Sequence, residues 1–311
     1  MNSPMASNPT QNLYVFKDRE SENLRLDRQY LVLQKSFDRG PTTLSESLQD
    51  GRVNKVLDVA AGSLAWIMDV ARSVEPSKVQ LYACDITPKH FPAKSVMDAF
   101  SITTFIHNAT QPFPQEMKAQ FDIVNMRLMA FSIMEDQWEI VLKNLYDILR
   151  PGGHLYLFDT DTTFYSGKEK DSNELRVDPW LSPINSMLLK FVQTAGYAPN
   201  LTRRFPDMLR ANSFIIEEQL TCYIPFGIAR KTNQSLKGAS LEGDEVFTGE
   251  TSKALIDSVL LHALDGGYLD DGYGRPVTTE AGRFQLLEKY KKDYDNNGII
   301  LQGTQIRAIR A

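Results

Sequence analysis

The chain has 311 residues, of which 42% are hydrophobic and 23% charged, and its formal net charge is −5. These values are those of an ordinary soluble globular protein, long enough for one large α/β domain with additions or for two small domains. The acidic balance argues against a nucleic-acid-binding surface. Two cysteines are too few for a disulfide framework, and no Cys/His spacing suggests zinc, so we expect buried, reduced thiols.

No apolar run approaches the length of a membrane span, and residues 1–11 lack the hydrophobic core of a signal peptide. We therefore expect a cytoplasmic protein that has neither membrane nor nucleic-acid partners.

Residues 1–52 are predicted to be a polar tail followed by helical segments. Apolar residues within 18–33 fall on one helical face, and charged residues occupy the rest. A solvated helix at the domain edge explains this pattern. So does a lid over a ligand pocket, from which Tyr14 and Arg25 would reach the ligand. A short helix is predicted at 44–48, before the turn at Asp50-Gly51.

Strand and helix patterns alternate from residue 53 onward. Most of the strand-like runs are followed by a helical segment, which predicts a doubly wound α/β fold with a mostly parallel sheet and helices on both faces. The predicted strands are 55–59, 79–84, 103–107, 121–126 and 154–158, and the clearest helices are 64–74 and 138–149.

The last third of the chain continues the pattern less regularly. In order, it contains a predicted helix at 183–195, a strand at 215–225, an exposed loop at 227–248, helices at 250–264 and 278–292, and a last strand at 298–309. We therefore predict that 53–311 forms one Rossmann-like domain with a seven-stranded sheet, and that a helical insertion at about 227–295 precedes the last strand.

The first predicted strand runs into the small-residue turn Ala60-Ala-Gly-Ser-Leu-Ala65. Small residues let a ligand approach the backbone where the next helix points its free N–H groups. A dinucleotide site would need G-x-G-x-x-G to admit a pyrophosphate, whereas this turn has only Gly62. S-adenosylmethionine has a ribose and an adenine but no phosphate. The turn therefore favours this cofactor and leaves a nicotinamide oxidoreductase as a distant alternative.

An acid, Asp85, ends the second predicted strand about 23 residues after Gly62. Ligands of open α/β sheets bind at the carboxyl ends of the strands, where a carboxylate can accept two hydrogen bonds from ribose hydroxyls. A solvated loop acid or a helix cap would give the same pattern, but the position favours the ribose contact.

Three segments resemble the fungal small-molecule methyltransferases related to LaeA and the enzymes called UMTA-type. Residues 22–30, ENLRLDRQY, are similar to that family's E-x-x-R-L-x-x-Q-H, and residues 56–69 to V-L-D-x-G-T-G-T-G-x-W-x-x-D. Residues 121–128 are similar to F-D-x-I-H-x-R and are followed by Leu149-Arg-Pro-Gly-Gly153. The resemblance covers roughly residues 12–160 and implies a class I fold that binds S-adenosylmethionine.

The resemblance also implies roles for individual residues. The first turn would face the methionine part of the cofactor, Asp85 the ribose, the residues after the third strand the adenine edge, and the end of the fourth strand the amino-acid end. Tyr14 and Arg25 would close the pocket. The implied cofactor residues are Tyr14, Arg25, Asp58, Ala60, Ala61, Gly62, Asp85, Ile86, Asn108, Ala109, Asn125, Met126 and Arg127.

The chain departs from the family pattern at several of these positions. The first and third glycines of the family's turn are Ala60 and Leu64 here, although the Leu64 side chain can point into the helix–sheet core instead of the pocket. The family's two histidines are Tyr30 and Asn125, and Asn108 stands where an acid often contacts adenine. These changes bear on catalytic turnover more than on cofactor binding.

Methyl transfer from a sulfonium is an in-line displacement, in which positioning supplies much of the rate and a base assists some acceptors. We assign no catalytic residue. Asp159 and Asp161, just past the fifth strand, either orient an acceptor or cap the next turn. Phe164, Tyr165 and Met187 either line an apolar substrate pocket or belong to the core. For the four histidines, His90, His107, His154 and His262, we expect structural roles.

The sequence thus predicts an S-adenosylmethionine-dependent O- or N-methyltransferase that acts on a small, partly apolar secondary metabolite, without a metal, and that could form a homodimer. Two alternatives keep the fold and the cofactor. One is a pericyclase- or cyclase-like enzyme that transfers no methyl group, and the other is a LaeA-like regulator.

Overall fold

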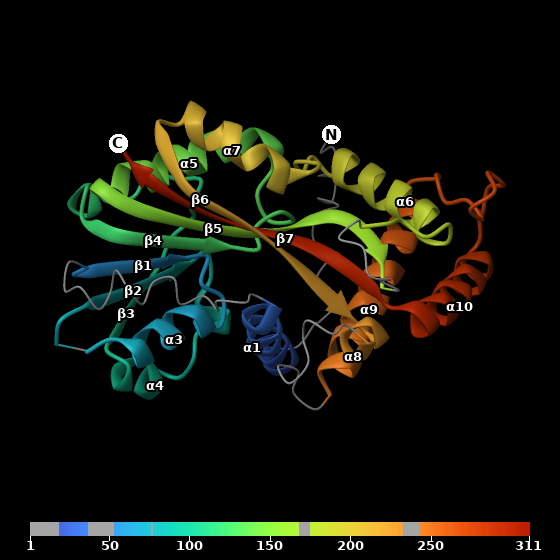
Figure 1. Cartoon of the computed structure of the whole chain (residues 1–311), viewed down its shortest axis with the longest axis horizontal. Helices are drawn as coiled ribbons and strands as arrows, with labels where there is room; N and C mark the ends of the chain where they lie inside the picture. The colour runs from blue at the N-terminus through green and yellow to red at the C-terminus, as the bar shows by residue number, and fades with distance from the viewer. Residues whose placement is uncertain (1–18, 37–52, 76, 168–174, 233–242) are drawn as a thin grey trace, which may run out of the picture. The chain divides into compact units, whose positions relative to one another are not determined.

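The computed structural model describes residues 19–36, 53–75, 77–167, 175–232 and 243–311. Seven strands of these residues form one sheet in the order β3-β2-β1-β4-β5-β7-β6 (Figure 1). The strands are β1 Lys55–Val59, β2 Gln80–Asp85, β3 Ile102–Ile106, β4 Phe121–Arg127, β5 Leu149–Ser166, β6 Phe214–Phe226 and β7 Ile299–Arg310.

Helices connect these strands. The α-helices are α1 Arg19–Ser36, α3 Ala65–Ser73, α4 Lys94–Ala99, α5 Trp138–Ile148, α6 Leu181–Thr194, α7 Leu201–Ala211, α8 Ile228–Thr232, α9 Asp244–Asp265 and α10 Glu280–Asn297, and the short 3₁₀ helices are η3 Pro88–His90, η4 Gln115–Met117 and η5 Glu135–Gln137. None of the helices in the described part of the chain is long and apolar enough to cross a lipid bilayer.

The chain divides into two compact units. The sheet unit comprises Asp18–Asp161, Asn200–Ile224 and Gln302–Ala311, and the helical unit includes Thr162–Pro199 and Pro225–Leu301. Because β5, β6 and β7 are long, each contributes residues to both units.

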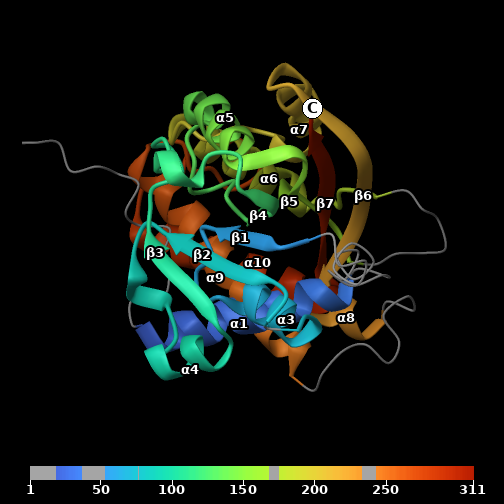
Figure 2. The same ribbon diagram turned by 90° about the vertical axis from the view of Figure 1, so that its left-hand side faces the viewer.

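The parallel part of the sheet lies in the sheet unit. Strand β1 pairs in parallel with both β2 and β4, β2 pairs with β3, and β4 pairs with β5. Helices α3 and α4 lie on one face of this sheet and α5 on the other (Figures 1 and 2). The mainly apolar strands β1 and β4 are almost fully buried because both faces of the sheet are covered. The arrowhead of β7 points opposite to those of β5 and β6, so the sheet is mixed. The predicted doubly wound, mostly parallel seven-stranded fold is confirmed.

Strand β5 is much longer than the predicted 154–158. The sequence Pro151-Gly152-Gly153 looked like a sharp turn, yet the strand passes through it, with a register shift against β4. Gly153 permits this, since a Cβ there would lie 2.9 Å from the carbonyl oxygen of Phe121. Beyond 158 the strand continues through threonines and aromatic residues, which favour extended backbone.

The prediction of an exposed loop at 227–248 is wrong in part. Helix α8 lies inside this range, and α9 begins at Asp244 instead of 250. The start of α9 was missed because its first residues, Asp244 and Glu245, are polar and follow a glycine. Gly243 precedes the helix in a left-handed conformation. Helix α7 was not predicted, because Pro206 lies inside it. The helix predicted at 44–48 lies outside the described residues.

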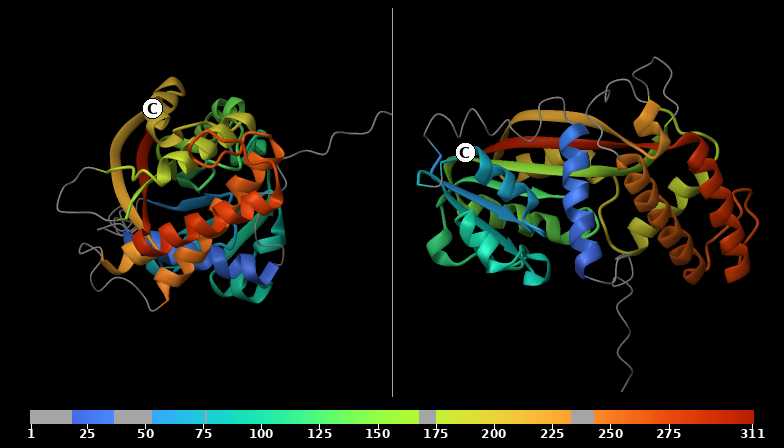
Figure 3. Two further views of the ribbon diagram at one scale, coloured as in Figure 1. Left: turned by 90° about the vertical axis from the view of Figure 1, so that its right-hand side faces the viewer. Right: turned by 90° about the horizontal axis from the view of Figure 1, so that it is seen from below.

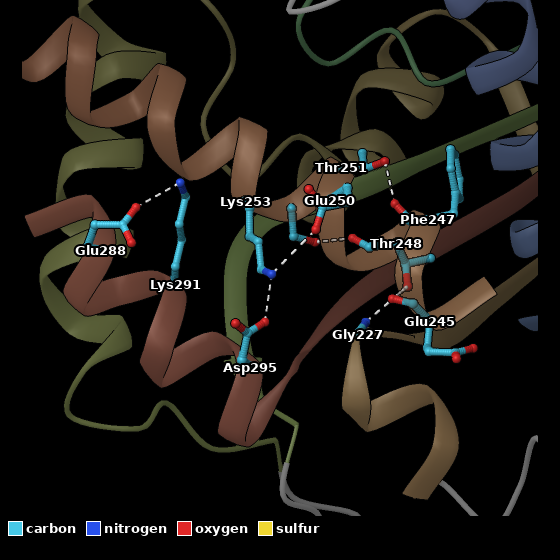
Figure 4. Close-up of polar contacts among 11 residues, drawn as sticks. Gly227, Glu245, Phe247, Thr248, Glu250, Thr251, Lys253, Glu288, Lys291 and Asp295 are labelled. Atoms are coloured by element: carbon cyan, nitrogen blue, oxygen red, sulfur yellow. Dashed lines mark hydrogen bonds and ion pairs between the residues drawn. The ribbon is translucent and has the colours of Figure 1, made fainter. Parts of the chain in front are cut away.

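The helical unit consists mainly of helices, with α9 packed against α6, α8 and α10 (Figure 3, left). Lys253 on α9 pairs with Asp295 on α10, with 2.7 Å between Nζ and Oδ1, and with Glu250 at 3.4 Å (Figure 4). The backbone N–H of Gly227 donates to the Thr248 hydroxyl at 3.0 Å. These contacts hold α10 and the start of α8 to α9.

Candidate functional site

The turn after β1 has an unusual backbone. Ala60, Gly62 and Leu64 have φ angles of 55°, 55° and 65°, which lie in the left-handed region. Two backbone hydrogen bonds hold the turn, from the Ala61 N–H to the Cys84 carbonyl at 3.0 Å and from the Leu64 N–H to the Ala61 carbonyl at 2.9 Å. A non-glycine residue in this conformation costs about 1–2 kcal/mol, so the fold retains strain at the edge where a ligand is expected.

Leu64 compensates for part of this strain. Its side chain is fully buried and packs in a core cluster with Val56, Ile67 and Leu81. The side chain therefore points into the helix–sheet core, so the loss of a glycine at this position does not fill the space above the turn.

Replacing Ala60 by glycine is expected to stabilise the protein by about 1 kcal/mol, because glycine adopts φ of 55° without the steric cost. The matched control is Ala71→Gly inside α3, where glycine should destabilise by roughly the same amount. Urea unfolding of both variants measures the two effects. A loss of stability in Ala60→Gly would show that the turn is not strained.

Asp85 stands beside this turn at the end of β2. Its Oδ2 accepts the Gly62 N–H at 3.0 Å, and its Oδ1 accepts the Thr87 N–H at 3.2 Å. The carboxylate thus ties the first turn to the next strand end and keeps free lone pairs for a ligand. The following residue, Ile86, is 65% exposed. An exposed apolar side chain next to a half-buried carboxylate suits the flat apolar and hydroxyl parts of a nucleoside.

The ends of β1 and β4 meet in a buried polar pair. The Asn125 side-chain amide donates to Asp58 Oδ1 at 2.7 Å, and both side chains are buried. Burial raises the pKa of Asp58 to about 7, against the opposing effects of the Arg127 charge and the Asn125 hydrogen bond. Met126 is buried, so only its backbone could serve a ligand at this edge.

The variant Asp58→Asn tests this electrostatic arrangement. Because the native pKa of Asp58 lies above the unfolded value of about 4, its contribution to stability is fully present below about pH 4 and is lost as the pH rises toward about 7. Asparagine does not titrate. The free energy of unfolding of the variant, relative to wild type, should therefore increase between about pH 4 and 7, as measured by urea unfolding across that range. A pH-independent difference would contradict the raised pKa.

The loop after β3 carries Asn108 and Ala109. Asn108 Oδ1 accepts from the backbone N–H of Thr110 at 3.0 Å and from its hydroxyl at 2.9 Å, which forms a tight local turn. Asn144 on α5 donates to the carbonyls of Ala109 and Gln111, both at 2.9 Å. These hydrogen bonds tie the loop to α5.

Helix α1 covers the first turn. A Cβ built on Gly62 would lie 3.4 Å from Leu26 Cδ1, so this leucine packs against the glycine. Arg25, predicted to reach the ligand, forms an ion pair with the buried Glu22 at 2.7 Å and donates to Gln29 at 3.1 Å. Tyr14 lies outside the described residues.

Asp159 does not cap a following turn, because β5 continues to Ser166, and it holds the earlier loop after β4 instead. Its Oδ2 accepts the N–H groups of Met129 at 2.7 Å and Ala130 at 2.9 Å, and its Oδ1 accepts the Thr160 N–H at 2.9 Å. Burial raises its pKa to about 7. Asp159 therefore orders the loop after β4.

The other substrate candidates lie in different places. The buried Asp161 pairs with Arg203 on α7, with 3.4 Å between Oδ2 and the guanidinium. Phe164, Tyr165 and Met187 belong to the helical unit and are buried there. The side chain of Asn185 bonds both the N–H and the carbonyl of Phe164.

Each of the four histidines has a nearby partner in the structure, and their structural roles stay a prediction. His90 Nδ1 lies 2.7 Å from Asn23 Oδ1, and His154 Nε2 lies 3.1 Å from Glu217 Oε2. His107 Nε2 lies 3.1 Å from the Gln111 carbonyl oxygen, and its ring is tilted against Phe113 with 4.0 Å between ring centres. The His262 ring lies edge-on to Phe191 at 4.6 Å. Among the described residues, no group of three or more His, Cys, Asp or Glu side chains is placed to hold a metal ion.

The cofactor candidates with described structure therefore gather at the carboxyl edge of β1, β2, β3 and β4, with Arg25 on the helix above. Sequence reasoning missed Asn144 on α5, which holds the loop after β3, and Asp69 on α3, whose Oδ2 accepts the Tyr30 hydroxyl of α1 at 2.7 Å. The signal that could have identified Asn144 is its position as an amide within the apolar face of α5.

The mostly parallel sheet of this order, with a small-residue first turn and an acid after β2, agrees with the class I fold that the sequence resemblance implies. Residues 56–153 match a family model described as a methyltransferase domain. The methyltransferase grgD of a Penicillium species is 25% identical over 213 residues, which are 66% of this chain and 70% of that protein.

Two further relatives are also fungal. The methyltransferase str2 of Strobilurus tenacellus is 30% identical over 50% of this chain and 52% of its own length. The secondary metabolism regulator LAE1 of Hypocrea atroviridis is 21% identical over 73% of this chain and 63% of its own length. Thus the chain spans less than two thirds of either of these relatives.

Among solved structures, a Haemonchus contortus phosphoethanolamine N-methyltransferase in complex with S-adenosylmethionine is 11% identical, with a TM-score of 0.46, over 99% of this chain and 61% of that one. The family match over residues 56–153 and the curated relatives support an S-adenosylmethionine-dependent methyltransferase, and they confirm the resemblance to the LaeA-related fungal methyltransferases.

Proposed function

We propose that the chain transfers a methyl group from S-adenosylmethionine to an oxygen or nitrogen of a small, partly apolar secondary metabolite. The observation that carries this proposal is the contact of Asp85 with the Gly62 N–H, which brings the expected ribose-binding carboxylate against the first turn. The names of the fungal relatives support the metabolic setting.

The residues at this edge fit the cofactor. The left-handed Gly62 leaves its position open except for Leu26 above it. Asp85 keeps lone pairs for ribose hydroxyls, and the exposed Ile86 offers an apolar surface to the adenine. In the proposal, Asn108 and Ala109 contact the adenine edge, while Asp58, Asn125 and the Met126–Arg127 backbone hold the amino-acid end.

When bound, the cofactor supplies an electrophilic methyl group on a sulfonium. The chain's own contribution is to hold the acceptor in line with that methyl group and to exclude water, and this can supply much of the rate. In the proposal, α1 forms a lid over this edge, and Asp161, Phe164, Tyr165 and Met187 help to bind the acceptor. Asp159 serves the loop after β4 and is not proposed as a base.

Calorimetric titration with S-adenosylmethionine and S-adenosylhomocysteine tests the cofactor part of the proposal. Assays with labelled methyl donor and a panel of phenols, carboxylic acids and amines then test transfer. Binding in the micromolar range, with label appearing in one class of acceptor, is the expected result. No binding of either ligand at millimolar concentration would rule out the proposal.

The regulator among the relatives favours one second candidate, a LaeA-like regulatory protein. In that case the chain would bind the cofactor, form a stable protein complex and methylate none of the small acceptors. Our proposal also places the protein in the cytoplasm as a homodimer without nucleic-acid partners, which fractionation and light scattering would check.

A further inference from the structure

Tyr30 joins α1 to the start of the main fold. It is buried, and its hydroxyl donates to Asp69 Oδ2 on α3 at 2.7 Å. The same oxygen accepts the Gln34 side-chain amide at 2.9 Å. Burial and the nearby Asp69 raise the pKa of Tyr30, so the hydroxyl remains a donor throughout the physiological pH range. A hydrogen bond to a carboxylate is among the stronger ones in proteins.

The ring of Tyr30 makes a second contact, to the end of β4. The guanidinium carbon of Arg127 lies 4.8 Å from the ring centre, which is cation–π geometry. Arg127 is the last residue of β4, and its charge also acts on the buried Asp58. Tyr30 therefore contacts an element of the proposed cofactor edge directly.

Two other residues of α1 reach the same edge. Asn23 lies 2.7 Å from His90 in η3, just after β2, and Leu26 packs on Gly62 in the turn after β1. Positions 23, 26 and 30 are spaced i, i+3 and i+7, so they share one face of the helix. In the right-hand view of Figure 3, α1 runs across the strands at their arrowhead ends. One face of α1 thus spans the carboxyl ends of β2, β1 and β4.

These contacts differ in strength. Leu26 makes an apolar contact, and Asn23 meets an imidazole, whereas Tyr30 combines a bond to a carboxylate with a contact to a cation. Opening of α1 at the Tyr30 end would break both of these charge-assisted contacts at once.

We propose that Tyr30 is a positioning residue that latches α1 over the cofactor, so that release of the cofactor requires the Tyr30–Asp69 and Tyr30–Arg127 contacts to separate. The proposal rests on the proposed function, because the latch acts on a cofactor at this edge. The latch is the Tyr30 side chain, and its partners are Asp69 on α3 and Arg127 on β4.

The test measures the dissociation rate of S-adenosylhomocysteine by stopped-flow mixing. Tyr30→Phe keeps the ring against Arg127 and removes only the hydroxyl, so dissociation should become about tenfold faster, as expected for the loss of one hydrogen bond to a charged group. The matched control is Tyr82→Phe, whose hydroxyl bonds Gln80 at an exposed site on β2. The control should release the ligand at the wild-type rate.

Variants at Asp69 separate a latch from general stabilisation. Asp69→Asn keeps an oxygen that can accept the Tyr30 hydroxyl and should release the ligand more slowly than Asp69→Ala, whereas Asp69→Ala, which also loses the Gln34 contact, should release it at least as fast as Tyr30→Phe. The double variant Tyr30→Phe/Asp69→Ala should be no faster than Asp69→Ala alone, because the shared bond is already lost. Melting temperatures are measured beside each rate, since a purely structural role would lower them without a selective change in release.

If Tyr30→Phe still binds S-adenosylhomocysteine but releases it at the wild-type rate, the latch is wrong and the proposed function stays intact. Additive rate increases in the double variant would also overturn it. Failure of the wild-type protein to bind S-adenosylhomocysteine would remove the proposed function and the latch together.

Discussion

Replacing Asp85 by alanine is expected to weaken the binding of S-adenosylmethionine by about 1–3 kcal/mol, or roughly 5–150-fold in Kd. The substitution removes the carboxylate proposed to accept from the ribose hydroxyls, and it also releases the N–H groups of Gly62 and Thr87. Calorimetric titration of the variant measures the effect.

Two controls separate these contributions. Asp85→Asn keeps one oxygen acceptor and should lose less affinity than the alanine variant. Asp98→Ala removes an exposed carboxylate that pairs with Lys94 on α4, away from the proposed site, and should bind like wild type. An unchanged affinity in Asp85→Ala would remove Asp85 from the cofactor site.

Replacing Asp244 by alanine is expected to destabilise the helical unit by about 3–5 kcal/mol. Arg230 and Asp244 are both 3% exposed, with 3.6 Å between their charged groups. Burial lowers the pKa of Arg230, and the nearby Asp244 opposes this shift. Removal of the carboxylate leaves a buried cation without its counter-ion. Urea unfolding, followed by helix circular dichroism, measures the loss.

The adjacent ion pair provides the matched control. Lys231 pairs with Glu245 one residue further along both helices, but the Lys231 side chain is 58% exposed. Glu245→Ala should therefore cost less than about 1 kcal/mol. The apolar double variant Arg230→Met/Asp244→Leu should recover most of the stability lost in Asp244→Ala. If Asp244→Ala costs no more than Glu245→Ala, the buried pair does not stabilise the unit.

The parallel core was predictable because its signals are local. The apolar runs of β1, β2 and β4 and the helical periodicity of α3 and α5 gave elements that begin and end close to the predicted residues. The length of β5 was not predictable, since its path through Gly153 depends on the backbone of β4 beside it. Helix α8 was hidden because its burial depends on Thr248 and Asp244, which come later in the chain.

For the candidate site, strand ends alone predicted where Asp85, Asn108 and Asn125 would lie, because parallel strands bring their carboxyl ends to one edge. The hydrogen-bond partners of these residues could not be predicted from the sequence. Asp159 caps a loop some thirty residues earlier in sequence, and Tyr30 finds Asp69 across a separation of 39 residues. Such pairs become visible only once the chain has folded.

A crystal structure of the protein with S-adenosylhomocysteine tests the central claim most directly. We expect the ribose hydroxyls at about 2.6–3.2 Å from the Asp85 carboxylate, the adenine beside Ile86 and Asn108, and the amino-acid end near Asp58 and Asn125. Ligand density away from the ends of β1 and β2, or an empty edge in a crystal saturated with S-adenosylhomocysteine, would contradict it.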